Sequence, residues 1–322
     1  MPLKSKASRS GSCLVAMTLS LATLITACGS DGNADEAATP PSGAAPSEVT
    51  VPISAAQVDV VSDGAEPREI VRHQPPVDAT QDSILTTSSQ VSQQIDGQPP
   101  QDFSSPELTL PLSVRVADAD GSDQEAATDS RTIELVLGDA DTPDGTLDGA
   151  LSHSEGSGVD LTVGPNGAVT ALRLQPAADA PDIARSAIEQ AFYQAVYRAL
   201  PFPETPIGVG AQWTVRQQVT SGITLDQTTT ATLRAREGNR LTIDIAIDQK
   251  PQSDVWMLDG EAGSLNIDQY TMSGNGSMTV DLDKPLPVDG SVSVGGDQHY
   301  SDPDGTTRLM QSITNNVEWG TP

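Results

Sequence analysis

Three aspartates stand close together near the middle of the chain. Asp139, Asp141 and Asp144 precede Gly145, and calcium is bound in proteins by several carboxylate and carbonyl oxygens held near one another. In a helix–loop–helix calcium loop glycine stands at the sixth position, but Asp144 occupies that place here. Turns also favour aspartate and glycine. We therefore expect no bound metal and keep these aspartates as weak calcium candidates.

Residues for hydrolytic chemistry do not form a known pattern. The sequence has no Gly-x-Ser-x-Gly motif, and Ser157 lies between Gly156 and Gly158 at a different spacing. None of the three histidines belongs to a His-Glu-x-x-His motif. We expect neither catalytic residues nor a cofactor. The alternative is a hydrolase or a calcium-dependent protein whose site the sequence does not reveal.

Cysteine occurs at two positions, and the second follows an export-like segment. A basic N-terminus without acidic residues leads into an apolar stretch from Leu14 to Ile25. Its end overlaps the run Leu24-Ile25-Thr26-Ala27-Cys28. That stretch is shorter than the roughly 20 apolar residues that cross a bilayer as a helix. The five residues of the run resemble the bacterial lipobox, in which the cysteine is acylated and the preceding residues are removed. A secretory signal with an incidental cysteine is the alternative.

The lipobox resemblance implies where the protein is held. Residues 1–27 would be a lipoprotein signal peptide, and Cys28 would carry the lipid anchor. The protein is then expected on the extracytoplasmic side, attached to the cell membrane through its N-terminal lipid. Since Cys13 would leave with the signal peptide, the mature domain would have no thiol for an internal disulfide.

Charge excludes one class of partner. The chain carries 44 acidic and 17 basic residues, and removal of residues 1–27 takes away three of the basic ones. The net charge then falls from −27 to −30. Lys250 and Lys284 are the only lysines left, whereas a protein that binds polyanions needs clustered lysine or arginine. Nucleic acid is therefore not expected as a partner, and the acidity is typical of a soluble surface.

Composition divides the remaining chain into a tether and a folded part. Residues 28–65 are rich in Ala, Pro, Ser and Gly and contain little that could be buried, so we expect a disordered tether. Within it, Val49 to Val61 is apolar enough to dock as an edge strand. Residues 66–322 are expected to form a single domain.

The folded part is predicted to be mainly β, of the α+β class. Apolar residues alternate with polar ones in several segments, which is the period of half-buried strands. Between them lie turn residues such as Glu237-Gly238-Asn239-Arg240. We therefore expect antiparallel hairpins. The clearest alternating segments are 108–116, 133–137, 241–247 and 278–282.

One amphipathic helix is expected at residues 180–200. Asp179 can cap its start, Pro181 suits the first turn, and Pro201 stands just past its end. One face carries apolar residues at helical spacing, with small side chains that allow close packing on a sheet. This stripe consists of Ala184, Ile188, Ala191, Phe192, Ala195 and Ala199.

The helix separates two segments with a similar order of elements. Each has a Thr-rich strand, an alternating strand and a Gly-rich turn followed by another strand, in the same order but with loops of different length. We therefore predict one duplicated domain with two similar antiparallel halves at about 66–178 and 201–322, joined by the helix.

The run from Pro201 to Trp213, with its Pro-rich entry to glycine and tryptophan, resembles an uncharacterised family of bacterial secreted and lipid-anchored proteins. The resemblance implies no catalytic residues, and Trp213 is expected in the core. A more distant similarity, in architecture alone, is to envelope lipid carriers with a curved sheet around helices.

Together these observations predict a non-enzymatic binding or structural role in the cell envelope. One alternative is a lipid or amphiphile carrier with a cavity between sheet and helix. Such a cavity would lie against the helix face that carries Ile188, Phe192 and Ala195. The expected partners are the membrane, through the N-terminal lipid, and a lipid or another envelope component.

Overall fold

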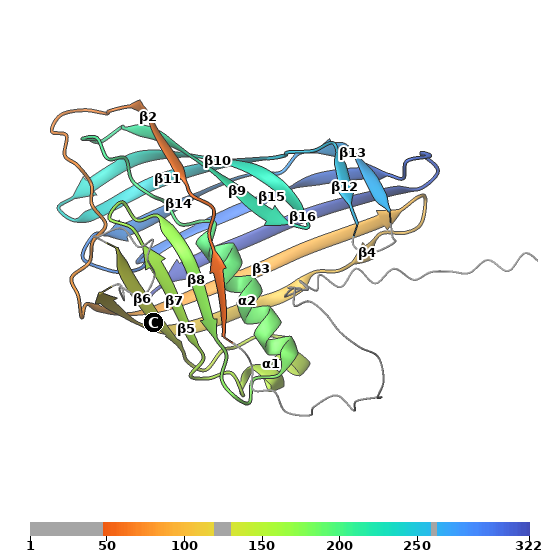
Figure 1. Ribbon diagram of the computed structural model, residues 1–322, viewed down its shortest axis with the longest axis horizontal. Helices are drawn as coiled ribbons and strands as arrows, with labels where there is room; N and C mark the ends of the chain where they lie inside the picture. Colours follow the sequence, from red (N-terminus) through yellow and green to blue (C-terminus); the bar gives the residue numbers. More distant parts are fainter. Residues whose placement is uncertain (1–47, 119–129, 259–262) are drawn as a thin grey trace, which may run out of the picture. The chain divides into compact units, whose positions relative to one another are not determined.

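A computed structural model describes residues 48–118, 130–258 and 263–322 (Figure 1). Cys28, the expected signal peptide at 1–27 and residues 28–47 of the expected tether lie outside the described residues. The fold is mainly β, as predicted, because two helices and one sixteen-stranded antiparallel sheet make up the regular structure of the described part.

The regular elements follow one another along the chain in a simple order. The first eight strands are β1 (Val49–Pro52), β2 (Gln57–Ser62), β3 (Thr80–Ile95), β4 (Gln101–Asp102), β5 (Ser105–Asp118), β6 (Arg131–Leu137), β7 (Gly158–Val163) and β8 (Val169–Gln175). The helices are α1 (Gly145–Leu151) and α2 (Asp182–Val196). The remaining strands are β9 (Gln212–Ser221), β10 (Ile223–Glu237), β11 (Arg240–Pro251), β12 (Val255–Met257), β13 (Ser264–Tyr270), β14 (Ser273–Asp281), β15 (Asp289–Ser301) and β16 (Arg308–Gly320). Three of the predicted alternating segments lie within β5, β6 and β11, and the fourth, 278–282, covers the end of β14 and one residue beyond it.

Two antiparallel meanders form the sheet. The first runs from β3 through β5, β6 and β7 to β8, and the second from β9 through β10, β11, β14 and β15 to β16. They join where β3 pairs with β16, in the middle of the sheet, with Leu85 opposite Trp319. Meanders on either side of α2 agree with the expected order of elements. The duplication of residues 66–178 and 201–322 stays a prediction.

Residues 49–62 contain the two outermost strands of this sheet and the short link between them, and we call this segment the edge strap. β1 pairs with β8, and β2 pairs with β9, although only four residues separate β1 from β2. An extended link of that length reaches less than about 20 Å. The thirteen strands of the main path would span roughly 55–60 Å if the sheet were flat. The sheet must therefore curl until its outer strands approach each other.

The edge strap corrects the expected domain boundary. Residues 28–65 were expected to be a tether, but 49–62 form two strands, so the folded part begins before residue 66. Ion pairs between Glu48 and Arg173 and between Asp59 and Arg216 accompany the strand pairing. The expectation that Val49 to Val61 docks at a sheet edge is confirmed, at both edges rather than one.

Helix α2 packs its predicted stripe into the core of the curled sheet. Ala184, Ile188, Ala191, Phe192 and Ala195 are all buried, and α2 contacts α1, β3 and β8. Figure 1 shows α2 running beside β8 and crossing β3, the two strands of the first meander that it contacts. The core it enters draws aliphatic side chains from both meanders, because alternate residues of each strand point to the same face.

The ends of the helix differ from the prediction. It begins at Asp182, with Pro181 at the N-cap and no side-chain cap hydrogen bond, so Asp179 is not its cap. It ends at Val196 rather than near residue 200, and Ala199 lies in the following turn. The ring of Pro181 fixes φ, here at −67°, and with ψ at 153° the backbone of the N-cap is extended. The chain enters the helix there without a side-chain acceptor.

Two glycines let β14 and β15 approach closely. A Cβ atom on Gly276 would lie 2.1 Å from the carbonyl oxygen of Ser291, and one on Gly274 would lie 2.2 Å from that of Ser293. Both clashes involve backbone atoms, so a side chain would force the strands apart. The glycine-rich strand thus has a packing role.

Candidate ligand cavity

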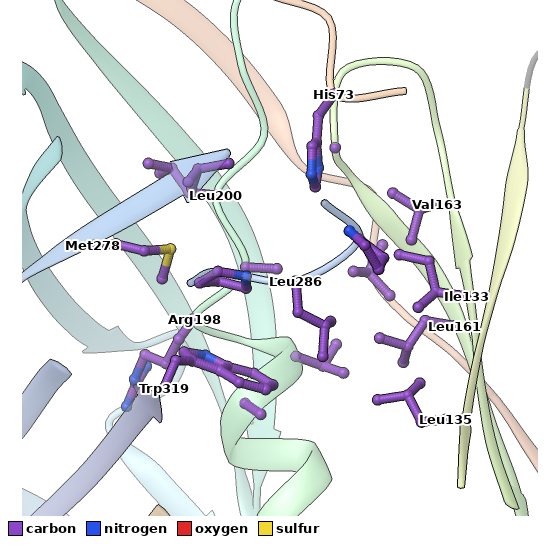
Figure 2. A pocket seen from close by; sticks show the side chains of 18 of the residues that line it. His73, Ile133, Leu135, Leu161, Val163, Arg198, Leu200, Met278, Leu286 and Trp319 are labelled. Carbon is purple, nitrogen blue, oxygen red and sulfur yellow. The ribbon is translucent and has the colours of Figure 1, made fainter. Parts of the chain in front are cut away.

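A small cavity lies where α2 ends between the two meanders. Its volume is about 70 Å³. Figure 2 shows apolar side chains from β6 and β7 on one side of it and from β14 and β16 on another. These side chains are Ile133, Leu135, Leu161, Val163, Met278 and Trp319. Ligand pockets are typically apolar with a few polar groups, and this lining has that character.

Helix α2 provides part of the wall at the predicted face. Phe192 and Ala195 line the cavity, as the carrier hypothesis expected. Ile188, one turn earlier, is buried in the core but does not line it. The cavity therefore lies against the C-terminal end of the helix, and the predicted position must be shifted by about one turn.

A loop between β14 and β15 places Leu286 in the cavity wall. Leu286 is 4% exposed and lies between the walls formed by the two meanders (Figure 2). Its backbone N–H donates to Gln81 Oε1 at 3.0 Å, and Gln81 Nε2 donates to the Pro287 carbonyl at 3.3 Å. Because the loop is held at both sides of Leu286, this side chain occupies space that a larger ligand would need.

Two basic side chains line the cavity at opposite ends, with Leu286 between them (Figure 2). His73 Nε2 donates to the Lys284 carbonyl at 2.8 Å, which implies that this nitrogen carries the proton. Burial lowers the pKa of His73, although the hydrogen bond to Lys284 acts in the opposite direction. The imidazole is therefore expected to be neutral at pH 7, where it fastens the Leu286 loop.

Arg198, at the other end, is buried without a carboxylate partner. It is 8% exposed and is the one charged residue in the buried class among those the structure describes. Its Nη1 donates to Gln227 Oε1 at 3.1 Å, and its Nε has no hydrogen-bond partner. Burial lowers the pKa of Arg198 to about 10, so the guanidinium remains charged at neutral pH.

The turn after α2 fixes the position of Arg198. The indole N–H of Trp213 donates to the Pro201 carbonyl at 3.0 Å, and the Phe202 and Trp213 rings lie 6.0 Å apart. The Phe202 N–H donates to the Asn166 carbonyl at 2.7 Å. Trp213 is fully buried, as predicted. The Pro-rich run thus anchors the end of α2 to both meanders.

Neighbouring glutamines orient the polar end of the cavity. Gln227 Oε1 also accepts a hydrogen bond from Gln249 Nε2 at 2.8 Å, while Gln227 Nε2 donates to the Tyr197 carbonyl at 3.0 Å. Gln227 and Gln249 are both buried. This amide therefore presents its oxygen to the guanidinium and cannot neutralise its charge.

Comparisons with known proteins assign no function. No family model and no curated protein matches this chain. A crystal structure of a Pseudomonas aeruginosa FadL homologue is similar at 11% identity, with 74% of this chain and 88% of that chain covered and a TM-score of 0.13. A TM-score that low supports no argument about fold or function.

Two of the three weak calcium candidates, Asp141 and Asp144, have structural roles. Asp144 Oδ1 accepts hydrogen bonds from the Thr146 and Leu147 N–H groups, both at 2.9 Å, and so caps α1. Asp141 exchanges backbone hydrogen bonds with Thr109. No group of three or more His, Cys, Asp or Glu side chains in the described ranges is placed to hold a metal ion. Helix α1 itself was not predicted.

The serine and histidine near α1 are likewise occupied locally. Ser157 Oγ donates to the Ser154 carbonyl at 2.7 Å and accepts from the Ala177 N–H at 3.0 Å. The His153 ring is exposed and lies 3.2 Å from the Gly149 carbonyl.

Of the helices in the described part, none is long and apolar enough to cross a membrane.

Sequence reasoning missed Arg198, although a signal for it exists. The buried stripe of α2 advances in steps of four and three residues, and Arg198 follows Ala195 at the next step of three. A cation that continues an apolar stripe is expected to enter the core. His73 and Leu286 come from loops, for which no periodic signal exists.

Proposed function

We propose that this protein is a non-enzymatic, lipid-anchored binding protein of the bacterial cell envelope that takes an apolar ligand into the cavity beside α2. The observation that carries the proposal is a largely apolar cavity, formed jointly by both meanders and α2, that contains a buried, unpaired guanidinium. A purely structural core would be expected to fill such a space, because protein interiors are close-packed.

The size of the cavity sets a condition on the ligand. Ligand pockets are typically about 300–1,000 Å³, whereas this cavity is about 70 Å³. A long apolar chain therefore requires Leu286 to move. The side chain belongs to a loop between two strands, and hydrogen bonds with His73 and Gln81 hold this loop rather than a strand ladder. Movement of this loop would leave the hydrogen bonds between the strands of the sheet intact.

The membrane attachment belongs to the same proposal. An N-terminal lipid on Cys28 would hold the folded part near a bilayer, which is a source of apolar ligands. If the residues between Cys28 and the edge strap form the tether that their composition predicts, about 20 residues would give it an average reach of roughly 25 Å in the flexible-chain estimate. The ligand-binding part would thus work close to the membrane surface.

Uptake of an environment-sensitive probe would test the binding function. N-phenyl-1-naphthylamine fluoresces in apolar surroundings, and the full chain, purified without detergent, is expected to bind it in a saturable way. Ala195→Met fills the cavity from α2 and should weaken binding at least about tenfold, the effect of roughly 1.4 kcal/mol. Ala187→Met, on the same helix but outside the lining, is the matched control and should bind normally.

Two results would contradict the proposed function. One is the absence of saturable uptake by the unaltered protein, which would favour a purely structural role. The other is equal uptake by the unaltered protein and Ala195→Met. Should Ala195→Met fail to fold, Ala199→Met provides a second test, because Ala199 also lines the cavity but is only partly buried.

A further inference from the structure

We infer that the cavity binds an amphiphile with a single negative charge, and that Arg198 binds its head group. A fatty-acid carboxylate has the required chemistry. This inference rests on the proposed function and specifies the class of ligand. It starts from the contrast between Arg198 and the other cations of the domain.

Most cations elsewhere in the described part of the domain form an ion pair with a carboxylate, and those that do not are less buried than Arg198. Arg115 contacts Asp78 and Glu134, and Arg236 contacts Glu69, all near the surface. The chain contains 44 acidic residues. Within the described residues, however, no carboxylate lies within ion-pair distance of Arg198, and the side chain is more than nine-tenths buried. The buried cation is thus left unneutralised in an otherwise strongly acidic protein.

An unpaired buried charge is costly in the folded state. Removing an ion from water costs several kcal/mol in real proteins unless a partner or good hydrogen bonds compensate for it. Arg198 has one hydrogen bond, to the neutral Gln227 oxygen, and its Nε–H has no acceptor. An anionic group entering the cavity would supply both the missing charge and the missing acceptor.

The chemistry of guanidinium favours this assignment. Arginine binds carboxylates through parallel N–H donors, and such charge-assisted hydrogen bonds are stronger than neutral ones. Gln227 occupies Nη1, and the Nε side of the fork is unused. The apolar walls formed by Leu161, Met278 and Trp319 would receive the hydrocarbon part.

The number of charges limits the head group to a monoanion. One guanidinium lies at this end of the cavity, and His73, at the other end, is neutral at pH 7 because burial lowers its pKa. A dianionic phosphate monoester would bring a second charge into the apolar site without a partner. A carboxylate would be fully neutralised.

The binding of three ligands that share a ten-carbon chain and differ in head group would test the inference. Decanoate, decanol and decyl phosphate would be titrated at pH 8 into the full chain by calorimetry. The unaltered protein is expected to prefer decanoate over decanol by roughly tenfold to hundredfold, the value of a charge-assisted hydrogen bond. Arg198→Gln should lose this preference but still bind decanol, and Arg198→Lys should retain part of it.

Arg240→Gln is the matched control. It removes the same charge from an exposed position in the β10–β11 hairpin, away from the cavity, and should leave all three affinities unchanged. Thermal unfolding gives a second readout. Arg198→Gln should unfold at the same temperature or higher, because it removes an uncompensated buried charge.

Each outcome separates the inference from the proposed function. If neither decanoate nor decanol binds the unaltered protein, the proposed function fails and the inference fails with it. If both bind equally, or if Arg198→Gln keeps the preference, the binding function stands and the inference is overturned. Equal loss of both ligands in Arg198→Gln would assign Arg198 a structural role instead. Tighter binding of decyl phosphate would refute the monoanionic head group.

Discussion

Replacing Leu286 with alanine should weaken the fold and enlarge the cavity in one step. A buried Leu→Ala substitution costs about 2–5 kcal/mol, with a component of about 24 cal/mol for each Å³ of empty space that remains. On that scale, the existing cavity of about 70 Å³ corresponds to about 1.7 kcal/mol. The fold therefore already tolerates empty space at this position, and the cavity walls have not moved inward to fill it.

The structure places the expected cost in the upper part of this range. Leu286 is 4% exposed, and Pro285 and Pro287 on either side restrict the backbone from moving inward. We expect a loss of about 3–5 kcal/mol in the free energy of unfolding. For a domain of this size the midpoint of thermal unfolding should fall by roughly 10 °C.

Ligand binding should offset this loss. Leu286→Ala should bind N-phenyl-1-naphthylamine more tightly than the unaltered protein, and a ligand at a hundredfold excess over its Kd should restore about 2.7 kcal/mol. Leu233→Ala is the control, since Leu233 is fully buried but does not line the cavity. It should lose similar stability without a gain in binding. A cost below about 1 kcal/mol, or equal binding gains in both variants, would refute the reasoning.

Three further predictions concern the anchor, a buried histidine and a glycine. Cys28→Ala should abolish labelling by a radioactive fatty acid, and label on the variant would contradict the lipobox assignment. Burial lowers the pKa of His73 in the folded state from its ordinary value of 6.5, so as the pH falls the unfolded state takes up this proton before the folded state does. The free energy of unfolding should therefore fall as the pH drops below 6.5. The charge of Asp281 raises the pKa of His73 and so makes this fall smaller. His73→Gln keeps a donor for the loop and should show a smaller fall in thermal midpoint between pH 7 and about pH 5, whereas parallel curves would argue against His73 as the source. Gly276→Ala should cost about 3 kcal/mol or more in a denaturant titration because its Cβ would meet backbone, while Gly145→Ala, which meets nothing within 4 Å, should be neutral; similar values for the two would contradict the close strand approach.

The sequence predicted the strands and α2 because their signals are local and periodic. The alternation in residues 108–116 became β5, and the apolar stripe around Phe192 became the buried face of α2. Capping was harder to predict. Asp179 was expected to cap the helix, but Pro181, whose ring fixes φ, stands at the N-cap instead. Asp144 caps α1, a helix that has no long apolar stripe.

The cavity was less predictable than the helix face beside it. Phe192 and Ala195 could be proposed from spacing, but Ile188 was included in error because the depth of the cavity along α2 depends on the opposite strands. Leu286 and His73 meet there through loops that are distant in sequence. Their approach depends on the closing of the curled sheet, which one sequence does not reveal.

The pairing of β3 with β16 has a consequence for how the chain acquires its structure. Ser88 and Asn316 share a hydrogen bond across 228 positions of sequence, and their strands form the middle of the sheet rather than an edge. Contacts so distant in sequence make folding slow, because loop closure costs entropy before the contact is gained. In a chain that emerges N-terminus first, one edge of β3 would stay unpaired until residues 308–320, which form β16, had followed. For a chain exported as the lipobox resemblance implies, such delayed closure would keep the polypeptide unfolded during passage and leave compaction to the far side of the membrane.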